Sequence, residues 1–146
     1  MNSSTLCFDF GNTRLKSALF VDSVLKEIIV LEDGTIETIE DLVKKFQPQK
    51  SILSSVIDHD QQIESLLSTS TKFHKLSHLT KLPFTTPVGR PETIGADRLA
   101  LVAAAVYFWP GRNNLVIGSG TCITYNFINK YHEFIGGGIS PGLEIR

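Results

Sequence analysis

The sequence predicts an α/β fold, in which helices pack against a mixed sheet of five strands and the start of a second, similar unit follows. Two observations support this prediction. Over residues 6–76, apolar runs and amphipathic segments follow one another in the order strand, strand, strand, helix, strand, helix, strand, and this order implies a mixed sheet with flanking helices. A strand–turn–strand pattern at residues 6–21 also returns at residues 114–128, and a repeat of this size suggests two similar units that face each other across a cleft.

Composition limits the classes of protein that this chain can represent. Of its 146 residues, 42% are hydrophobic and 20% are charged, which indicates a globular chain with one well-buried core and part of a second. The formal net charge of −1 argues against binding nucleic acid through a basic surface, and no apolar run in the sequence reaches the length of a membrane span. The first residues lack the pattern of a secretory signal. Because Cys7 and Cys122 lie in apolar runs, we expect reduced core thiols in a cytoplasmic protein.

Five runs rich in apolar and β-branched residues are the predicted strands of the first unit. They lie at residues 6–10, 15–21, 24–31, 51–57 and 72–76. A helix is predicted over residues 39–46, with Thr38 as its N-cap, Asp41 in the capping-box position and Pro48 as the residue that stops it. A second amphipathic helix is predicted over residues 58–67.

The second half of the chain begins with a loop rich in Pro and Thr at residues 78–92, which can carry function, connect two subdomains, or both. Asp97 and Arg98 then precede an almost wholly apolar helix at residues 99–109, which we expect to be buried all round. The remaining predicted elements are strands at 114–117 and 122–128, a short strand at 134–135 and a Gly-rich segment at 136–142.

The domain organisation follows from the repeat. Residues 1–110 are predicted to form the first domain, including the apolar helix, and residues 111–146 the beginning of the second. Because the second unit stops after its first strands, we expect the chain to be the N-terminal portion of a longer protein. We also expect residues 1–146 alone to show negligible catalytic activity, since the cleft would be half built.

The stretch from Asp9 to Lys16 is the strongest candidate for a binding site. It places a carboxylate, a small turn and a lysine between two predicted strands. Gly11 permits either a positive φ or a close backbone approach to a ligand, and Asn12 and Thr13 are typical turn residues that offer polar groups. Such a turn can hold a metal–phosphate group, with its amides and Lys16 on the phosphate and Asp9 on the metal. An ordinary polar β-hairpin turn is the alternative, since motifs this short often occur without function.

Asp97 also has two interpretations. A carboxylate at the N-terminal end of a helix is stabilised in its charged form by the helix dipole. Asp97 can therefore be a structural helix-end acid paired with the neighbouring Arg98. Alternatively, an ionised aspartate at the mouth of a cleft can accept a proton from a hydroxyl group.

Four motifs occur in one order across the whole chain. They are Asp9-Phe10-Gly11-Asn12-Thr13 with Lys16, Gly95-Ala96-Asp97-Arg98, Gly120-Thr121 with Thr124, and Gly136-Gly137-Gly138-Ile139-Ser140-Pro141-Gly142. Together they resemble the motifs of type III pantothenate kinases, which belong to the superfamily of acetate kinase, sugar kinases, Hsp70 and actin. The resemblance implies a ribonuclease H-like (actin-like ATPase) domain with the mixed five-stranded sheet and flanking helices, followed by the start of a second such domain.

The resemblance further implies ATP-dependent phosphorylation of pantothenate to 4′-phosphopantothenate, the first step of coenzyme A biosynthesis, by a cytoplasmic homodimer. It makes Asp97 the catalytic base and Asp9 the residue that serves Mg²⁺. The implied substrate-binding residues are Gly95, Ala96, Asp97 and Arg98. The residues implied to bind the ATP phosphates are Asp9, Gly11, Asn12, Thr13, Lys16, Gly120 and Thr121. A monovalent cation, K⁺ or NH₄⁺, is also implied.

Three positions depart from the family pattern. Gly118 stands where the second phosphate turn usually begins with Asp, and this loss of a negative charge weakens the case for the monovalent-cation site. Asn126 replaces a later Asp of the same strand, and Val88 replaces a Tyr that helps to shape the pantothenate pocket. Two alternatives therefore stay open. One is a nucleotide-binding relative without activity that acts as a regulatory or binding protein, and the other is a kinase of the same superfamily with another small hydroxylated substrate.

Overall fold

The computed structural model describes residues 3–87 and 89–145, and the chain divides into two compact units, residues 1–76 and 77–146. Residues 77–110 fall in the second unit, whereas the sequence pattern assigns them to the first domain. A compact unit need not coincide with a domain of the fold, so the domain boundary after residue 110 stays a prediction.

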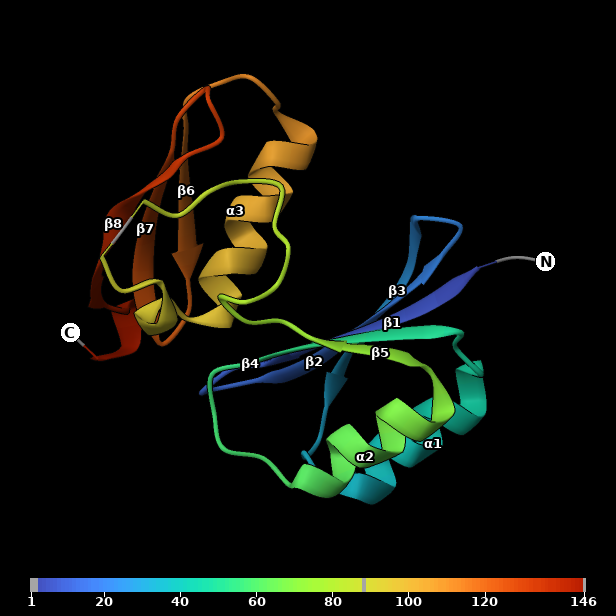
Figure 1. Cartoon of the computed structure of the whole chain (residues 1–146). Helices are drawn as coiled ribbons and strands as arrows, with labels where there is room; N and C mark the ends of the chain where they lie inside the picture. The colour runs from blue at the N-terminus through green and yellow to red at the C-terminus, as the bar shows by residue number, and fades with distance from the viewer. Residues whose placement is uncertain (1–2, 88, 146) are drawn as a thin grey trace. The chain divides into compact units, whose positions relative to one another are not determined.

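The first unit is built on a mixed five-stranded sheet, as predicted (Figure 1). Its strands are β1 (Ser4–Phe10), β2 (Leu15–Val21), β3 (Val24–Leu31), β4 (Lys50–Ser55) and β5 (Lys72–Lys75). They lie in the order β3-β2-β1-β4-β5; β2 is antiparallel to both β1 and β3, whereas β4 is parallel to both β1 and β5. The carboxyl ends of β1 and β4 therefore meet at one edge of the sheet, beside the turn that leads from β1 into β2.

Two helices pack on the same face of this sheet (Figure 1). They are α1 (Ile36–Phe46) and α2 (Gln61–Ser70). The predicted N-cap of α1, Thr38, is wrong, because the Thr35 hydroxyl caps the helix by accepting a hydrogen bond from the Thr38 amide at 3.4 Å. Asp41 consequently lies well inside the helix and outside the capping-box position. The second helix starts later than predicted, because Asp60 caps it by accepting from an amide of the first turn at 2.8 Å.

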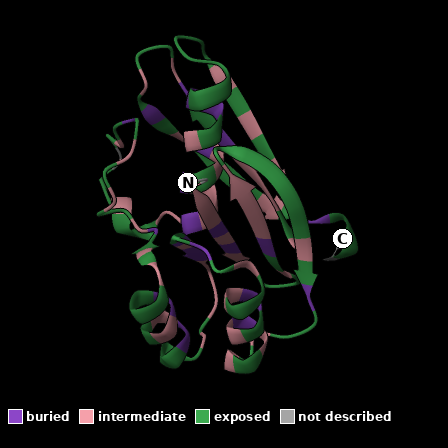
Figure 2. Ribbon diagram, turned by 90° about the vertical axis from the view of Figure 1, so that its right-hand side faces the viewer, coloured by how far each residue is buried: buried purple, intermediate pink, exposed green. Residues whose placement is uncertain are grey.

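The core of the first unit lies between the sheet and these two helices. Leu6, Phe8 and Phe10 alternate along β1 and are all buried, as expected for the helix-covered face of a strand. Figure 2 shows such buried positions in purple. The other buried members of this core are Leu31, Ile39, Leu42, Leu53, Ile63 and Leu67.

The second unit contains an antiparallel sheet in the order β6-β7-β8, with α3 packed on one face (Figure 1). Its elements are the 3₁₀ turn η1 (Pro91–Thr93), α3 (Ala96–Phe108), β6 (Asn114–Ser119), β7 (Cys122–Ile128), β8 (Phe134–Pro141) and the 3₁₀ turn η2 (Leu143–Ile145). The prediction of a strand limited to residues 134–135 is wrong, because most of the Gly-rich segment continues it as β8. Backbone pairing with β7 outweighs the low strand propensity of glycine.

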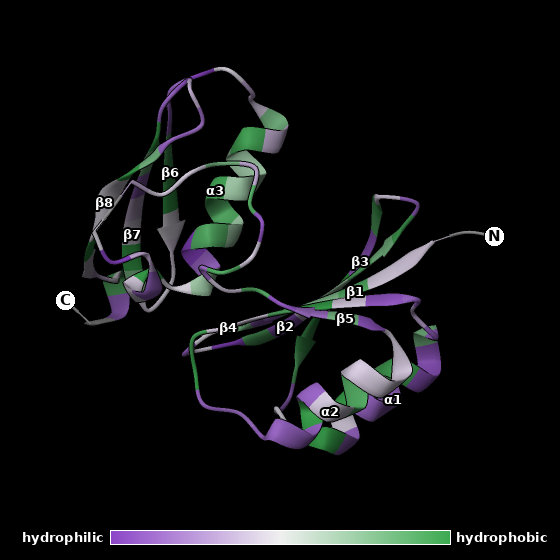
Figure 3. Ribbon diagram, viewed as in Figure 1, coloured by the Kyte–Doolittle hydropathy of each residue, from purple (hydrophilic) through white to green (hydrophobic). Residues whose placement is uncertain are grey.

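The helix α3 is less buried than its apolar sequence predicts. Figure 3 colours most of it as hydrophobic. Tyr107 and Phe108, at its C-terminal end, are nevertheless 76% and 65% exposed, so the prediction of burial all round is wrong. The buried positions recur along one face and are Ala96, Leu99, Val102, Ala105 and Val106.

Both cysteines are free thiols, but they differ in burial. Cys7 is partly buried, and this burial raises the pKa of its thiol. Cys122 is exposed at the start of β7, so its predicted core position is wrong. Among the described residues, no helix combines the length and the apolar character needed to cross a bilayer.

Candidate active site

The hairpin turn between β1 and β2 carries the first group of candidate residues. Asp9 and Lys16 are directly paired across the two strands, so their side chains lie on the same face of the sheet. The turn is closed by a hydrogen bond of 3.1 Å from the Gly11 amide to the Arg14 carbonyl. Asn12 and Thr13 are exposed at its tip. This one hairpin thus presents a carboxylate, an ammonium group and polar tip residues together, as a phosphate-binding turn requires.

Gly11 is needed for space and not for an unusual backbone angle. Its φ lies outside the left-handed region, so a positive φ, one of the two possibilities raised by the sequence, is wrong, and the other, a close backbone approach to a ligand, stays a prediction. A Cβ at this position would lie 3.2 Å from the Arg14 carbonyl oxygen. A larger residue would therefore have to open the turn.

Ser54 is a candidate site residue that could not be picked out from the sequence alone. It pairs with Asp9 in the register between the parallel strands β1 and β4, so the two side chains lie on one face about 5 Å apart. The Ser54 side chain is buried, and its hydroxyl oxygen has no hydrogen-bond partner within the described residues. A carboxylate beside an unpartnered hydroxyl is a set of hard oxygen donors, which fits Mg²⁺. The signal in the sequence was a serine at the end of a buried strand, but its neighbour could be known only from the strand register.

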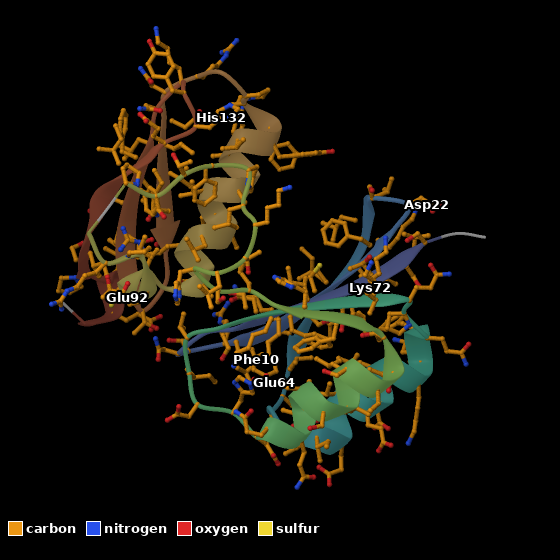
Figure 4. All side chains as sticks on the ribbon, in the orientation of Figure 1. Phe10, Asp22, Glu64, Lys72, Glu92 and His132 are labelled. Atoms are coloured by element: carbon orange, nitrogen blue, oxygen red, sulfur yellow. The ribbon has the colours of Figure 1, made fainter. Side chains whose placement is uncertain are left out.

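A hydrogen-bonded cluster supports the end of β1. The Val56 amide donates to the Phe10 carbonyl at 3.0 Å, and the His59 ring packs edge-on against Phe10 with centroids 5.8 Å apart. His59 Nε2 lies 2.8 Å from Glu64 Oε1, which also accepts a hydrogen bond from Lys75 Nζ at 2.7 Å. Lys75 is the main cause of the lowered pKa of Glu64. Figure 4 labels Phe10 and Glu64, two members of this cluster.

The first turn of α3 carries the second group of candidate residues. Gly95 is the N-cap and offers no side chain to the free amides of the helix. Asp97 partly replaces such a cap, because its Oδ1 accepts a hydrogen bond from the Arg98 amide at 2.8 Å. The carboxylate is half-buried and lies at the positive end of the helix dipole. This geometry fits both interpretations of Asp97, the helix-end acid and the proton acceptor.

Arg98 is held by the sheet beneath it. Its Nε donates to Asn126 Oδ1 at 2.6 Å, and its Nη2 donates to the Tyr125 carbonyl at 3.4 Å. Asn126 is fully buried, and its Nδ2 donates to the Val116 carbonyl and to Thr124 Oγ1. The amide of Asn126 therefore has a fixed orientation, with its oxygen toward Arg98. In the sequence Asn126 is a departure from the family pattern, and no local signal reveals its contact with Arg98, which joins residues 28 positions apart.

The turn between β6 and β7 carries the third group, Gly120 and Thr121. The Gly120 amide donates to the Cys122 carbonyl at 3.0 Å, which closes the turn. The Gly142 amide donates to the Thr121 carbonyl at 2.9 Å, and a Cβ on Gly142 would overlap the carbonyl oxygens of Gly120 and Thr121. The end of the Gly-rich segment thus packs directly against this turn.

The second unit brings its two groups of candidate residues to the same end. Leu101, one helical turn beyond Asp97, reaches Gly118 near the end of β6. The start of α3 therefore lies toward the turn that contains Gly120 and Thr121 (Figure 1). The candidate residues of the first unit form a separate group around its hairpin turn.

A family model described as type III pantothenate kinase matches residues 5–146. The chain belongs to the type III pantothenate kinase family. It is 45% identical over 143 residues to a type III pantothenate kinase of Christiangramia forsetii, covering 97% of this chain and 59% of that relative. It is 40% identical over 144 residues to a type III pantothenate kinase of Flavobacterium johnsoniae, again covering 97% of this chain and 59% of the relative. The chain thus spans about three fifths of the length of these curated relatives.

A solved structure gives the fold independently of close sequence similarity. The type II variant of the Aquifex aeolicus Ppx/GppA phosphatase matches 98% of this chain and 54% of its own chain, with a TM-score of 0.52 and 12% identity. At this identity the likeness concerns the fold alone. Together with the mixed five-stranded sheet and its flanking helices, it confirms the predicted ribonuclease H-like (actin-like ATPase) fold of this pantothenate kinase family member.

The departures from the family pattern have different structural settings. A Cβ on Gly118 would lie 2.7 Å from Thr124 Oγ1 and 2.9 Å from Leu101 Cδ1, so both side chains would have to shift to admit an aspartate. The residues at this position do not fit a monovalent cation held by a carboxylate. Asn126 keeps the contact to Arg98 described above. Val88 lies outside the described residues.

Proposed function

We propose that the full-length protein transfers the γ-phosphoryl group of ATP to the primary hydroxyl of pantothenate and so forms 4′-phosphopantothenate, the first step of coenzyme A biosynthesis. The observation that carries this proposal is the family match over residues 5–146. It is supported by Asp9, Lys16, Asp97 and Arg98, which stand in the motif positions at the hairpin turn and at the start of α3. The relatives' printed name supplies the substrate.

The proposed phosphate-binding groups are the two hairpin turns. In the first, the amides and hydroxyls of Gly11, Asn12 and Thr13 and the ammonium group of Lys16 donate to phosphate oxygens. In the second, Gly120 and Thr121 do the same. Phosphoryl transfer depends mainly on positioning and on electrostatic stabilisation, and rigid turns closed by backbone hydrogen bonds suit this purpose.

Asp9 is proposed to hold Mg²⁺, directly or through water, with the unpartnered hydroxyl of Ser54 beside it. When bound, Mg²⁺ neutralises the negative charge of the phosphate groups. The part played by the chain is to fix these oxygen donors at the end of β1, where the cluster around His59 supports the strand.

Asp97 is proposed as the general base. Its half-buried carboxylate would orient the pantothenate hydroxyl and accept its proton as the new phosphate bond forms. Gly95 and Ala96, which precede it, let the substrate approach the start of the helix, and Arg98 would fix the substrate by hydrogen bonding. The contact from Arg98 to Asn126 keeps the guanidinium group in place for this role.

Three finer properties are also proposed. We propose a homodimer because the family resemblance implies one. We propose a cytoplasmic location because ATP is available there and because both cysteines are free thiols. The family resemblance also implies K⁺ or NH₄⁺, but we propose that no monovalent cation is held at Gly118, which carries no carboxylate and where Thr124 and Leu101 would have to shift to admit one.

The test is the release of ADP by the full-length protein with and without pantothenate. Release that depends on pantothenate supports the proposed kinase. ATP binding without release in the presence of pantothenate or of other small alcohols contradicts it and indicates a binding protein. Release that depends on another hydroxylated compound, and not on pantothenate, contradicts the proposed substrate.

A further inference from the structure

His59 joins the ends of β1 and β4 to the start of α2, at the edge of the sheet where the first hairpin turn lies. Its side chain is only 7% exposed. The ring packs edge-on against Phe10, the last residue of β1, and Nδ1 lies 3.1 Å from the hydroxyl oxygen of Ser55, the last residue of β4. Nε2 lies 2.8 Å from Oε1 of Glu64 in the first turn of α2, to which Lys75 at the end of β5 donates.

These hydrogen bonds fix the orientation of the imidazole ring. Lys75 lowers the pKa of Glu64, so this carboxylate is ionised at neutral pH and can only accept. Nε2 of His59 must therefore carry the hydrogen of that contact. Because the other ring nitrogen contacts Ser55, the ring cannot rotate without breaking a hydrogen bond.

Phe10 passes this constraint to the hairpin turn. It is 1% exposed, and its ring packs edge-on against both Phe8 and His59, with centroids 6.2 and 5.8 Å away. In the chain it directly follows Asp9 and precedes Gly11. The tip of the turn is exposed, so the direction in which the turn leaves the sheet depends on how Phe10 is held.

A comparable contact occurs at the opposite end of β4, far from the turn. Ser51 Oγ lies 2.6 Å from Oγ1 of Thr71, the C-cap of α2. Ser51 pairs with Leu6 near the start of β1, whereas Ser55 pairs with Phe10 at its end. Four residues of strand, about 13 Å, separate the two serines. The Ser51 contact therefore provides a matched control for the contacts of His59.

We propose that His59 is a positioning residue of the reaction: by holding Phe10, it sets the orientation of the first hairpin turn toward the phosphate groups of ATP. The inference rests on the proposed function, because that function makes this turn a phosphate-binding turn. It goes beyond the function by giving a role to a residue outside all four motifs of the resemblance. Glu64 contributes to this role as a hydrogen-bond acceptor.

The test is calorimetric binding of ATP with Mg²⁺ to the full-length protein and to His59→Phe, which keeps a ring beside Phe10 and loses both hydrogen bonds. Ser55 still contacts the Ile57 carbonyl and Glu64 still accepts from Lys75, so this variant should fold. We expect its Kd for ATP to rise about 2–10-fold, the worth of a hydrogen bond, with the Kd for pantothenate unchanged.

Ser51→Ala is the control, and it should lower the melting temperature and leave the Kd for ATP unchanged. A purely structural role of His59 would give this same result, because it changes the folded fraction and not the affinity of the folded protein. An unchanged Kd for ATP in His59→Phe, or an equal rise in Ser51→Ala, would overturn the proposal.

Two substitutions of Glu64 test the same proposal without changing His59. Glu64→Gln keeps an oxygen that accepts from Nε2, so it should bind ATP as the wild type does. Glu64→Leu removes the acceptor and should raise the Kd for ATP about 2–10-fold. If His59→Phe does not fold, these two variants decide the proposal, and equal ATP affinity of both would overturn it.

Hydrogen exchange separates this proposal from the proposed function, since it needs no substrate. The Gly11 amide donates to the Arg14 carbonyl, and the Val56 amide donates to the Phe10 carbonyl. Both amides should exchange about 2–10-fold faster in His59→Phe and not in Ser51→Ala. If they do and no ADP is released with pantothenate, the proposed function fails and the positioning by His59 stands. If ADP is released but the KM for ATP and both exchange rates are unchanged in His59→Phe, the reverse holds.

Discussion

Asp97 is the residue on which the proposed chemistry depends most. Its Oδ1 accepts from the Arg98 amide within the first turn of α3, which is also what a purely structural helix-end acid would do. Asp97→Asn keeps this oxygen and removes the charge. As a general base, Asp97 should be worth about 10²–10⁴-fold in kcat, so we expect Asn to lower kcat by that factor with little change in the KM for ATP.

The control for Asp97 is Asp60, a helix N-cap carboxylate in α2 that has no proposed role in the chemistry. Asp60→Asn should leave kcat unchanged, and each variant should cost about 0.3–1 kcal/mol in stability at most. Measuring kcat and melting temperature on both variants decides whether Asp97 is a general base or a structural helix-end acid. An intact kcat in Asp97→Asn would make Asp97 a helix-end residue and nothing more.

Asp9 and Ser54 form the second pair of residues with a testable role. Asp9→Asn should abolish Mg²⁺-dependent ATP turnover and shift the melting temperature little, since it removes a charge and no core volume. Wild-type turnover in this variant, or unfolding, would show that Asp9 is not the metal residue.

Ser54→Ala should raise the Mg²⁺ concentration needed for half-maximal turnover several-fold. Removing a buried hydroxyl that has no partner should not destabilise the protein. Ser17 is the matched control: it is another buried serine without a partner in the same sheet, but it pairs with Phe8 and so lies on the helix-covered face. An equal change in Mg²⁺ dependence for Ser17→Ala would contradict the role of Ser54.

The sequence identifies candidate site residues that lie together along the chain and misses candidates that are brought in by strand pairing or packing. Asp9 to Lys16 and Gly95 to Arg98 are contiguous motifs, so local chemistry suffices to single them out. Ser54 joins Asp9 only through the register of two parallel strands. Asn126 joins Arg98 across 28 residues through the packing of α3 on β7. Neither pairing is encoded in a local pattern.

At the scale of elements, β8 shows how tertiary pairing changes a local prediction. Three successive glycines favour a loop on propensity alone, yet they pair with β7 along its length. A Cβ on Gly137 would overlap the Tyr125 carbonyl, whereas a Cβ on Gly138 would meet nothing closer than 3.9 Å. Close approach of the two strands therefore requires glycine at Gly137 and does not require it at Gly138.

This difference predicts the outcome of two neighbouring substitutions. Gly137→Ala should destabilise the protein by about 1–3 kcal/mol or more, because the obstacle is rigid backbone. Gly138→Ala should change stability by less than about 0.5 kcal/mol. Chemical denaturation of both variants measures the two values, and equal stability of the two would show that β7 and β8 do not approach as described.

The cluster around Glu64 gives a dependence on pH. Lys75 lowers the pKa of Glu64 below its ordinary value of 4.5, so the carboxylate stabilises the folded state above that value, and the contribution is lost as pH falls through the lowered pKa. Lys75→Met should lower the melting temperature by about 1–3 °C at pH 7, the scale of a partly exposed ion pair. The difference from the wild type should shrink toward pH 3.

Lys72, an exposed lysine on the same strand, provides the control for this prediction. Lys72→Met should leave the dependence of melting temperature on pH as in the wild type. A difference between Lys75→Met and the wild type that persists undiminished at pH 3 would show that Glu64 is not the group concerned.

At the scale of the whole molecule, the alternation of strands and helices was sufficient to predict the fold class, and the motifs were sufficient to predict the family. The five strands of the first unit follow from apolar runs separated by polar turns. The exposure of Tyr107 and Phe108 could not be predicted, because an apolar sequence does not show where the sheet beneath a helix ends. The starts of α1 and α2 also differ from the predicted ones. Several polar residues near each start can serve as the N-cap, and packing selects among them.

The central claim is that phosphoryl transfer from ATP to pantothenate is the reaction of this protein. The most direct measurement is incubation of the full-length protein with ATP labelled in the γ-phosphate, Mg²⁺ and pantothenate, followed by identification of the labelled product by mass. We expect the label to appear in 4′-phosphopantothenate, and Asp97→Asn to slow its formation by about 10²–10⁴-fold. Label found only in free phosphate or in a different compound, or unchanged product formation by Asp97→Asn, would contradict it.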